Sequence, residues 1–281
     1  MTIKELNDYI KKSLSENHIE YADEESVIIL ENILKYDKTK LLLNGSKIVD
    51  TKTVNTINSI IDRRIKGEPL QYILGIWQFM GLDFLVGSGV LIPRDDTEIL
   101  VNAASAIIKK ENINNLVDLC SGSGIISILL KHQYKNLEVT AVEKSSIAYN
   151  YLLKNIKKHN LDINAVNLEI EDYVKKINDN TIDLLVSNPP YIKTDDIKNL
   201  QKEIQYEPFM ALDGGNDGLD FYRYIINNYK NKIKSGGYIA FEIGEGQYKD
   251  VSYILLDNGF VDLSSYNDIQ NIVRVVSARK N

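Results

Sequence analysis

Hydrophobic positions recur at helical spacing along the first 67 residues. A first apolar face starts at Ile3, directly after Thr2, which has with Glu5 the spacing of a capping box. Similar faces begin near residues 23 and 54, and Gly67 is a suitable stop for the last helix. The pattern predicts a small helical bundle over residues 1–67.

The pattern changes between residues 68 and 93, where β-branched, aromatic and glycine residues are frequent. Two short runs, 76–80 and 82–86, flank Gly81 and have the character of hairpin strands. We interpret residues 68–93 as a β-hairpin connector between two domains.

From residue 94 to residue 281, strand-like and helix-like segments alternate. This order predicts an α/β domain with a mainly parallel, Rossmann-like sheet of seven strands. The link between the last two strands is too short for a crossover helix, so the last strand should run antiparallel. Asp95 and Glu98 have the spacing of a second capping box. The expected strands are 116–119, 139–142, 165–168, 182–186, 238–243, 260–263 and 272–276, and the expected helices are 97–110, 124–131, 145–159, 221–233 and 248–256.

Composition narrows the class of protein. The net charge is −6 and the sequence pI is about 5.3, which argues against a protein that mainly grips nucleic acid. A single cysteine, Cys120, allows no internal disulfide, and no apolar run has the length of a membrane span. These features predict a cytoplasmic protein that binds neither membrane nor nucleic acid directly.

The first candidate site is a turn rich in small residues that follows the strand 116–119. Small residues let the backbone approach a ligand, and the next helix presents free N–H groups. The turn lacks the spacing of a P-loop and resembles the D-x-G-x-G-x-G motif of Rossmann-like methyltransferases, which cradles S-adenosylmethionine. Glu143 follows about 20 residues later, where an acid can accept both ribose hydroxyls. The candidate cofactor-binding residues are Asp118, Cys120, Ser121, Gly122, Ser123, Gly124 and Glu143.

Alternatives remain open for this turn. A dinucleotide-binding fold shares the same features, and an ordinary tight turn with a solvated Glu143 would leave the same pattern. Cys120 has no evident histidine partner, so neither a catalytic thiol nor a metal site is expected.

The second candidate site is the run Asn188-Pro189-Pro190-Tyr191, after the strand 182–186. Two prolines fix the backbone and remove N–H donors, which leaves acceptors and a flat aromatic ring. The Asn188 oxygen and the Pro189 carbonyl could orient a conjugated nitrogen while Tyr191 packs on its planar group. Alignment rather than a strong base would then carry methyl transfer. A proline-rich turn without function is the alternative.

Five further motifs accompany these two sites, at residues 68–75, 92–98, 207–219, 241–247 and 274–276. Together with both sites, and over nearly the whole chain, they resemble the HemK/PrmC family of glutamine methyltransferases. The resemblance implies transfer of a methyl group from S-adenosylmethionine to the glutamine of the Gly-Gly-Gln motif of peptide chain release factors, with S-adenosylhomocysteine as product. It also implies that the N-terminal helical domain helps to grip the release factor.

The resemblance adds further site residues. Asp172 and Tyr173 match an Asp-Trp pair that flanks the adenine, and Asn188 would touch both cofactor and substrate. Arg94 and Glu98 belong to a matching motif, although Glu98 is equally explained as a helix cap. Residues 207–219 either line the site or form an ordinary long loop.

Three rival functions share parts of this pattern. A sister enzyme acts on a glutamine of a large-subunit ribosomal protein, and amino methyltransferases of nucleic acid use a similar Asn-Pro-Pro-aromatic motif. A non-catalytic binding module is the third. We expect a monomeric protein methyltransferase with release factors as its partners.

Overall fold

The computed structural model describes all residues, 1–281, and divides into two compact units. The first comprises residues 1–77 and a short later segment, 201–206, and the second comprises residues 78–200 and 207–281. The expected connector, 68–93, is divided between the two units. The chain therefore leaves the second unit after residue 200, contributes six residues to the first unit, and returns at residue 207.

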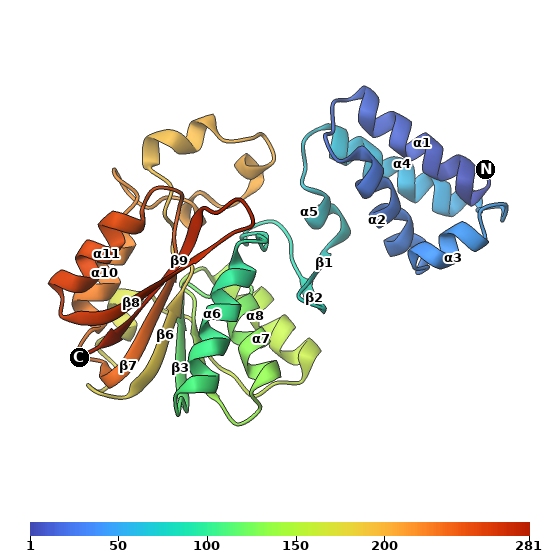
Figure 1. Ribbon diagram of the computed structural model, residues 1–281. Helices are drawn as coiled ribbons and strands as arrows, with labels where there is room; N and C mark the ends of the chain where they lie inside the picture. Colours follow the sequence, from blue (N-terminus) through green and yellow to red (C-terminus); the bar gives the residue numbers. More distant parts are fainter. The chain divides into compact units, whose positions relative to one another are not determined.

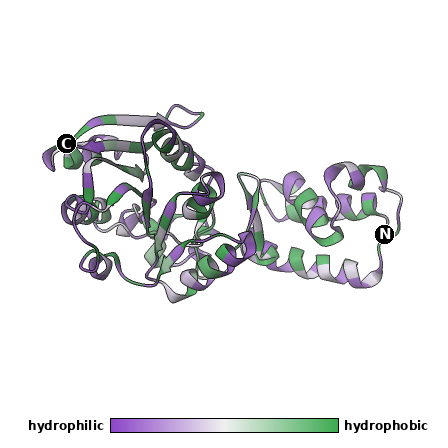
Figure 2. Ribbon diagram, turned by 90° about the horizontal axis from the view of Figure 1, so that it is seen from below, coloured by the Kyte–Doolittle hydropathy of each residue, from purple (hydrophilic) through white to green (hydrophobic).

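Five helices form the first unit, and their apolar faces produce its core (Figure 1). Thr2 and Glu5 form the expected capping box on the first helix, and Gly67 follows the fourth helix with φ of +97°. Figure 2 shows hydrophobic and hydrophilic residues interleaved along these helices, the pattern of helices that bury one face. The elements are α1 (Ile3–Glu16), α2 (Ala22–Leu34), α3 (Lys38–Leu43), α4 (Thr51–Ile65) and α5 (Leu70–Leu74).

The buried Arg64 side chain binds the segment 201–206 to this unit. The Arg64 side chain on α4 is 4% exposed and donates to both carboxylate oxygens of Glu25, at 2.8 and 2.9 Å. It also donates to Glu203 at 2.6 Å, and the Tyr206 hydroxyl donates to the Lys66 carbonyl at 3.2 Å. These bonds hold the returning segment against α4.

Arg64→Ala should lower the free energy of unfolding of the first unit by about 3 kcal/mol, because it leaves the Glu25 carboxylate, whose side chain is only 12% exposed, without its partner. The neighbouring Arg63→Ala removes an ion pair whose arginine is 44% exposed, and should cost within about 1 kcal/mol. Urea unfolding of both variants measures the difference. Equal losses would contradict the role of the buried ion pair.

The hairpin predicted from the sequence is present. It consists of β1 (Ile76–Phe79) and β2 (Leu82–Leu85). Met80 and Gly81 both have positive φ, at 45° and 79°, as the twist of a two-residue hairpin loop requires. The boundary between the two units falls within β1.

The second unit is built on a seven-stranded sheet with the order β5-β4-β3-β6-β7-β9-β8. Neighbouring strands from β5 to β7 run parallel, whereas β9 pairs antiparallel with both β7 and β8. The expected fold, with an antiparallel last strand, is confirmed. The strands are β3 (Asn115–Leu119), β4 (Glu138–Val142), β5 (Asn164–Val166), β6 (Ile182–Ser187), β7 (Ile233–Glu242), β8 (Phe260–Asn267) and β9 (Val273–Lys280).

Helices cover both faces of this sheet (Figure 1). One group comprises α6 (Thr97–Lys110), α7 (Ile125–Gln133) and α8 (Ser146–His159), and the other comprises α10 (Asp220–Tyr229) and α11 (Tyr248–Asp257). The strand order reverses between β3 and β6, which makes their carboxyl ends the switch point at which open α/β sheets bind ligands.

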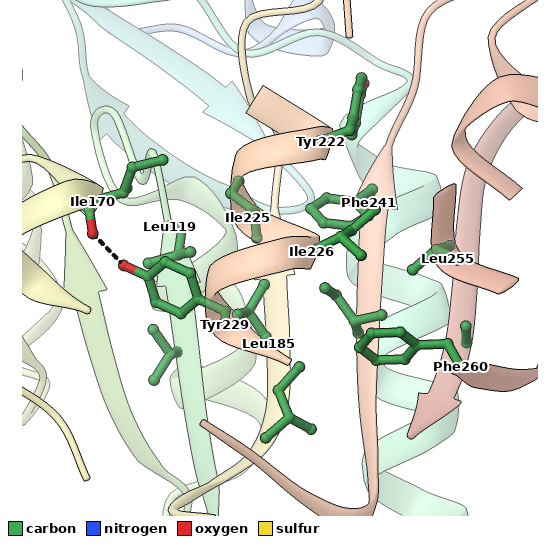
Figure 3. Packing of buried hydrophobic residues seen from close by; sticks show 14 of the residues in the cluster. Leu119, Ile170, Leu185, Tyr222, Ile225, Ile226, Tyr229, Phe241, Leu255 and Phe260 are labelled. Carbon is green, nitrogen blue, oxygen red and sulfur yellow. Dashed lines mark hydrogen bonds between the residues drawn. The ribbon is translucent and has the colours of Figure 1, made fainter. Parts of the chain in front are cut away.

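The core beneath α10 combines buried aliphatic side chains with four aromatic ones, Tyr222, Tyr229, Phe241 and Phe260 (Figure 3). Tyr222 meets Phe241 edge to face, with ring centroids 5.3 Å apart. Tyr229 is completely buried, and its hydroxyl donates to the carbonyl of Ile170 at 2.7 Å, within the short helix α9 (Ile170–Tyr173). This packing fixes α10 on the sheet and supports the loop that precedes it.

Two predictions about helix ends are wrong. Asp95 and Glu98 form no capping box: the N-cap of α6 is Asp96, which makes no side-chain cap bond, and the Asp96 carboxylate lies 3.3 Å from Arg274. The helix expected over 221–233 ends at Tyr229, because Ile233 already begins β7.

None of the helices combines the length and the apolar character needed to cross a membrane.

Candidate active site

The turn after β3 has the tight backbone that its small residues predict. Gly122 and Gly124 have φ of +55° and +87°, and Cys120 has φ of +60°, a left-handed conformation that few non-glycine residues adopt. The Ser187 hydroxyl at the end of β6 donates to the Leu119 carbonyl at 2.6 Å. The carboxyl ends of the two strands at the switch point are thereby tied together.

Asp118 supports this turn from behind. Its carboxylate is fully buried and accepts from the backbone N–H of Ser127 at 3.2 Å and from the Ser127 hydroxyl. Burial raises the pKa of Asp118 to about 7, and one of its oxygens, Oδ1, has no partner. Asp118 does not line the pocket described below, so its contribution is to the shape of the turn.

Glu143 lies at the end of β4 with only 9% of its surface exposed. Its carboxylate accepts from the backbone N–H groups of Gly122 and Ser145, at 2.8 and 2.7 Å. Burial raises the pKa of Glu143. The two N–H bonds aim the carboxylate at the pocket side of the turn, and each oxygen keeps a lone pair for another donor.

A pocket lies over the carboxyl ends of β3, β4 and β6. Its walls combine apolar side chains with the backbone of the small-residue turn. The Ser121 hydroxyl, which belongs to a lining residue, is buried without a partner. An apolar slot with an aimed carboxylate and an unpaired hydroxyl suits a nucleoside-like ligand. The lining residues are Gly89, Val90, Leu91, Pro93, Arg94, Thr97, Cys120, Ser121, Gly122, Ser123, Ile125, Ile126, Val142, Glu143, Lys144, Ser145, Ala148, Leu168, Ile170, Glu171, Asn188, Pro190, Pro208, Met210, Ala211 and Phe221.

Asp172 and Tyr173 do not line this pocket. The Asp172 carboxylate pairs with Lys175 at 2.9 Å on the surface, and Tyr173 is buried in the core. The pocket wall at this point is made by Leu168, Ile170 and Glu171 instead. The Asp172-Tyr173 pair that the resemblance places beside an adenine is thus not part of the pocket lining.

The Asn-Pro-Pro-Tyr run follows β6 and brings Asn188 and Pro190 to the pocket. The Asn188 amide nitrogen donates to the Thr97 hydroxyl at 3.3 Å. Tyr191 packs against the hydrophobic core, and its hydroxyl donates to Glu242 at 3.4 Å. Neither Pro189 nor Tyr191 lines the pocket, so the run presents one amide and one proline ring to it.

The segment 207–219 packs onto this run. Ile192 bonds to the backbone on both sides of Asp213, through the Leu212 carbonyl at 3.0 Å and the Gly214 N–H at 2.8 Å. A Cβ on Gly214 would lie 2.7 Å from the Tyr191 Cα, so only glycine permits this approach. The segment also brings Pro208, Met210 and Ala211 to the pocket, which favours its interpretation as part of the site.

Arg94 and Glu98 have different surroundings. Arg94 lines the pocket and pairs with the buried carboxylate of Glu207. Glu98 is exposed in the first turn of α6 and makes no contact with the pocket. The positive N-terminal end of the helix dipole stabilises a carboxylate at this position. Glu98 therefore needs no role at the site to explain it.

Sequence reasoning missed three residues that hold the site together. Thr97 lines the pocket and donates to the buried Glu242 at 2.7 Å. The Gln247 amide donates to the carbonyls of Tyr191 and Gly218, at 3.0 and 3.1 Å. All three residues lie in the motifs at 92–98 and 241–247 that resemble the family. No other signal in the sequence points to them. No group of three or more His, Cys, Asp or Glu side chains gathers to hold a metal ion.

Two family models match the chain. The PrmC N-terminal domain matches residues 5–75, and the methyltransferase small domain matches residues 95–214. The second match contains the turn after β3, Glu143 and the Asn-Pro-Pro-Tyr run.

Curated relatives cover nearly the whole chain. A release factor glutamine methyltransferase of Clostridium botulinum is 41% identical over 255 residues, which is 90% of each chain. One of Geobacter sulfurreducens is 37% identical over 279 residues, which is 99% of this chain and 96% of the relative. The chain belongs to the release factor glutamine methyltransferase family.

Solved structures support the fold. A methyltransferase from Pyrococcus furiosus superposes with a TM-score of 0.52 at 16% identity, over 78% of this chain and 97% of that one. The T. thermophilus 16S rRNA methyltransferase RsmC, solved with AdoMet and guanosine, gives a TM-score of 0.51 at 15% identity, over 73% of this chain and 50% of that one. At such low identity the likeness concerns the methyltransferase fold alone.

Proposed function

We propose that this protein transfers a methyl group from S-adenosylmethionine to the side-chain amide nitrogen of the glutamine in the Gly-Gly-Gln motif of peptide chain release factors. The observation that carries the proposal is the position of Asn188. Its side chain lines the same pocket as Glu143 and the turn after β3, at the switch point of the sheet. A methyl donor and an amide acceptor bound there would meet at Asn188.

The cofactor's requirements match residues of this pocket. The Glu143 carboxylate would accept the ribose hydroxyls, and the Gly122 backbone would pass beside the amino-acid portion. Leu168 and Ile170 offer an apolar wall for the adenine. The unpaired Ser121 hydroxyl offers one further polar contact. When bound, S-adenosylmethionine would supply an activated methyl group on a positively charged sulfur.

The chain's own task would then be to orient a weak nucleophile. The lone pair of an amide nitrogen is delocalised, so attack requires both N–H hydrogens to be held and the lone pair to be aimed. The Asn188 Oδ1 would accept one of these hydrogens, and the carbonyl of Pro189, which lies in the chain between the two lining residues Asn188 and Pro190, would accept the other. Oxygen acceptors beside the nitrogen also stabilise the positive charge that the nitrogen gains as the methyl group transfers. The proton would leave to water afterwards.

The choice of release factors as substrate rests on the relatives. Both quoted relatives carry the name release factor glutamine methyltransferase and match over 90% or more of this chain. The N-terminal unit, which also matches a family model of its own, is the part that would hold the release factor. The protein would act as a cytoplasmic monomer and would need no metal ion.

Methyl transfer from labelled S-adenosylmethionine tests the proposal directly. Purified release factor should accept label, and the same factor with its motif glutamine changed to alanine should accept none. Label on ribosomal protein or RNA but not on release factor would overturn the choice of substrate. Absence of transfer to all three, with cofactor bound, would overturn methyl transfer itself.

A further inference from the structure

A carboxylate is buried behind Asn188 that the proposed mechanism does not use. Glu242 is the last residue of β7, and its side chain is 1% exposed. The register pairs Ser187 with Phe241, so Asn188 and Glu242 leave the ends of neighbouring strands side by side. Burying a carboxylate is costly unless its hydrogen bonds are made, so the partners of Glu242 reveal what it does there.

The partners of Glu242 form a chain that ends at Asn188. The Thr97 hydroxyl donates to Glu242 Oε2 at 2.7 Å, and the Asn188 amide nitrogen donates to the same Thr97 oxygen at 3.3 Å. The Tyr191 hydroxyl donates to Glu242 Oε1 at 3.4 Å. Thr97 and Asn188 line the pocket, whereas Glu242 stands behind them.

This chain has a direction that the charge of Glu242 sets. An ionised carboxylate can only accept, so Thr97 must point its single proton at Glu242. The Thr97 oxygen can then only accept from its other neighbour. Asn188 must therefore turn its NH₂ group to Thr97 and its Oδ1 away from it. A protonated Glu242 can instead donate to Thr97, which frees the Thr97 proton for the Asn188 oxygen and removes the constraint.

We propose that Glu242 is a positioning residue that fixes, through the Thr97 hydroxyl, which end of the Asn188 amide faces the substrate. The inference rests on the proposed function, because it matters only where an amide N–H must be accepted. An asparagine presenting Oδ1 accepts the substrate hydrogen. If the Asn188 amide is turned by 180°, its NH₂ group faces the substrate NH₂ group. Both groups are donors, so no hydrogen bond forms between them.

The charges around Glu242 agree with a switch near neutral pH. Burial raises the pKa of Glu242 to about 7, the Thr97 bond lowers it, and the nearby Asp96 carboxylate raises it further. Tyr191 lowers this pKa by donating its hydroxyl, and the Asn188 NH₂ group, which donates to Thr97, also lies close enough to Glu242 to lower it. Arg274 is engaged by Asp96 and Asp268, and Tyr222 bonds only to the Glu242 backbone carbonyl.

The expected pH dependence follows from the sign of this shift. The orienting form of Glu242 is the ionised one, which prevails above its pKa. The rate of methyl transfer in the wild-type protein should therefore fall as the pH drops through about 7. Glu242→Gln cannot ionise, so it should show a lower kcat with no acid limb, because a neutral amide sets no direction along the chain.

A pair of Thr97 variants separates orientation from structure. Thr97→Val removes the hydroxyl but keeps the shape, and should lower kcat about 100-fold while the cofactor dissociation constant, measured by calorimetry, stays within about threefold. Thr97→Ser retains the hydroxyl and should restore most of kcat. Equal activity of the valine and serine variants would overturn the proposal, as would a wild-type kcat and pH profile in Glu242→Gln.

One measurement needs no substrate and so separates this inference from the proposed function. In protein labelled with ¹⁵N-asparagine, the side-chain NH₂ signal of Asn188, assigned by its loss in Asn188→Ala, should titrate with a midpoint near 7 in the wild type and not in Glu242→Gln. The same signal without titration in the wild type would overturn the role of Glu242, whatever substrate the protein proves to have. Wild-type transfer to release factor reports separately on the proposed function.

Discussion

Asn188→Ala should reduce kcat for methyl transfer by about 10²–10³-fold, because in the proposed mechanism it deletes the acceptor for one hydrogen of the substrate amide. Cofactor binding should change little by comparison, since the turn after β3 and Glu143 remain in place. The fold should persist as well, because the lost amide contributes only a long side-chain hydrogen bond, to Thr97 at 3.3 Å, and an interaction with the Glu242 carboxylate. Single-turnover methyl transfer under saturating cofactor measures the effect.

An exposed asparagine on the same unit provides the matched control. Asn102 lies on the solvent face of α6 and alanine is the better helix former there, so Asn102→Ala should retain full activity. Substantial methyl transfer by Asn188→Ala would show that the Pro189 carbonyl and the cofactor's own position suffice to align the amide. Asn188 would then lose its place in the mechanism.

The sequence predicted the sheet well because each strand is bounded by its own local signals. The strands β3, β4 and β6 are short apolar runs, each followed by a turn residue, and the structure extends each by one residue at most at either end. The antiparallel last strand was predicted from the length of the link between the last two strands. Parallel pairing needs a crossover of a dozen or more residues, and this link is too short to form one. Tertiary packing decides the short helices α3 and α5, which have too few turns to show a periodic pattern.

Residues at the site were predictable where the chain itself brings them to the pocket. Residues 120–123 of the turn and Asn188 directly follow strands, so the direction of a parallel sheet places them at the pocket, whereas Gly124 does not line it. Glu242 and Thr97 are far apart in sequence and become neighbours only when β7 and α6 pack together, so neither was predicted as a site residue. Asp172 does not line the pocket, because it is exposed on the short helix α9 and its carboxylate pairs with Lys175.

Gly218→Ala should impair catalysis far more than stability. Gly218 has φ of +79°, and an added Cβ would lie 2.4 Å from the Tyr191 carbonyl oxygen and 2.7 Å from the Gln247 amide nitrogen. The backbone oxygen cannot move without the chain that carries Asn188. A displacement of about 1 Å at a reacting group can cost about 100-fold in rate. We expect a loss of that order in kcat.

Gly246→Ala isolates the cost of the backbone conformation. Gly246 also has a positive φ, +83°, but an added Cβ would meet nothing within 4 Å. Both variants should therefore lose about 1 kcal/mol of stability from the left-handed conformation, and only Gly218→Ala should lose activity. Thermal unfolding and methyl transfer, measured on both proteins, separate the two effects. Equal kcat values would mean that the contact between Gly218 and Tyr191 does not matter for catalysis. A lower kcat in Gly218→Ala alone would mean that the loop 214–219 holds the Asn-Pro-Pro-Tyr run, and with it Asn188, in position.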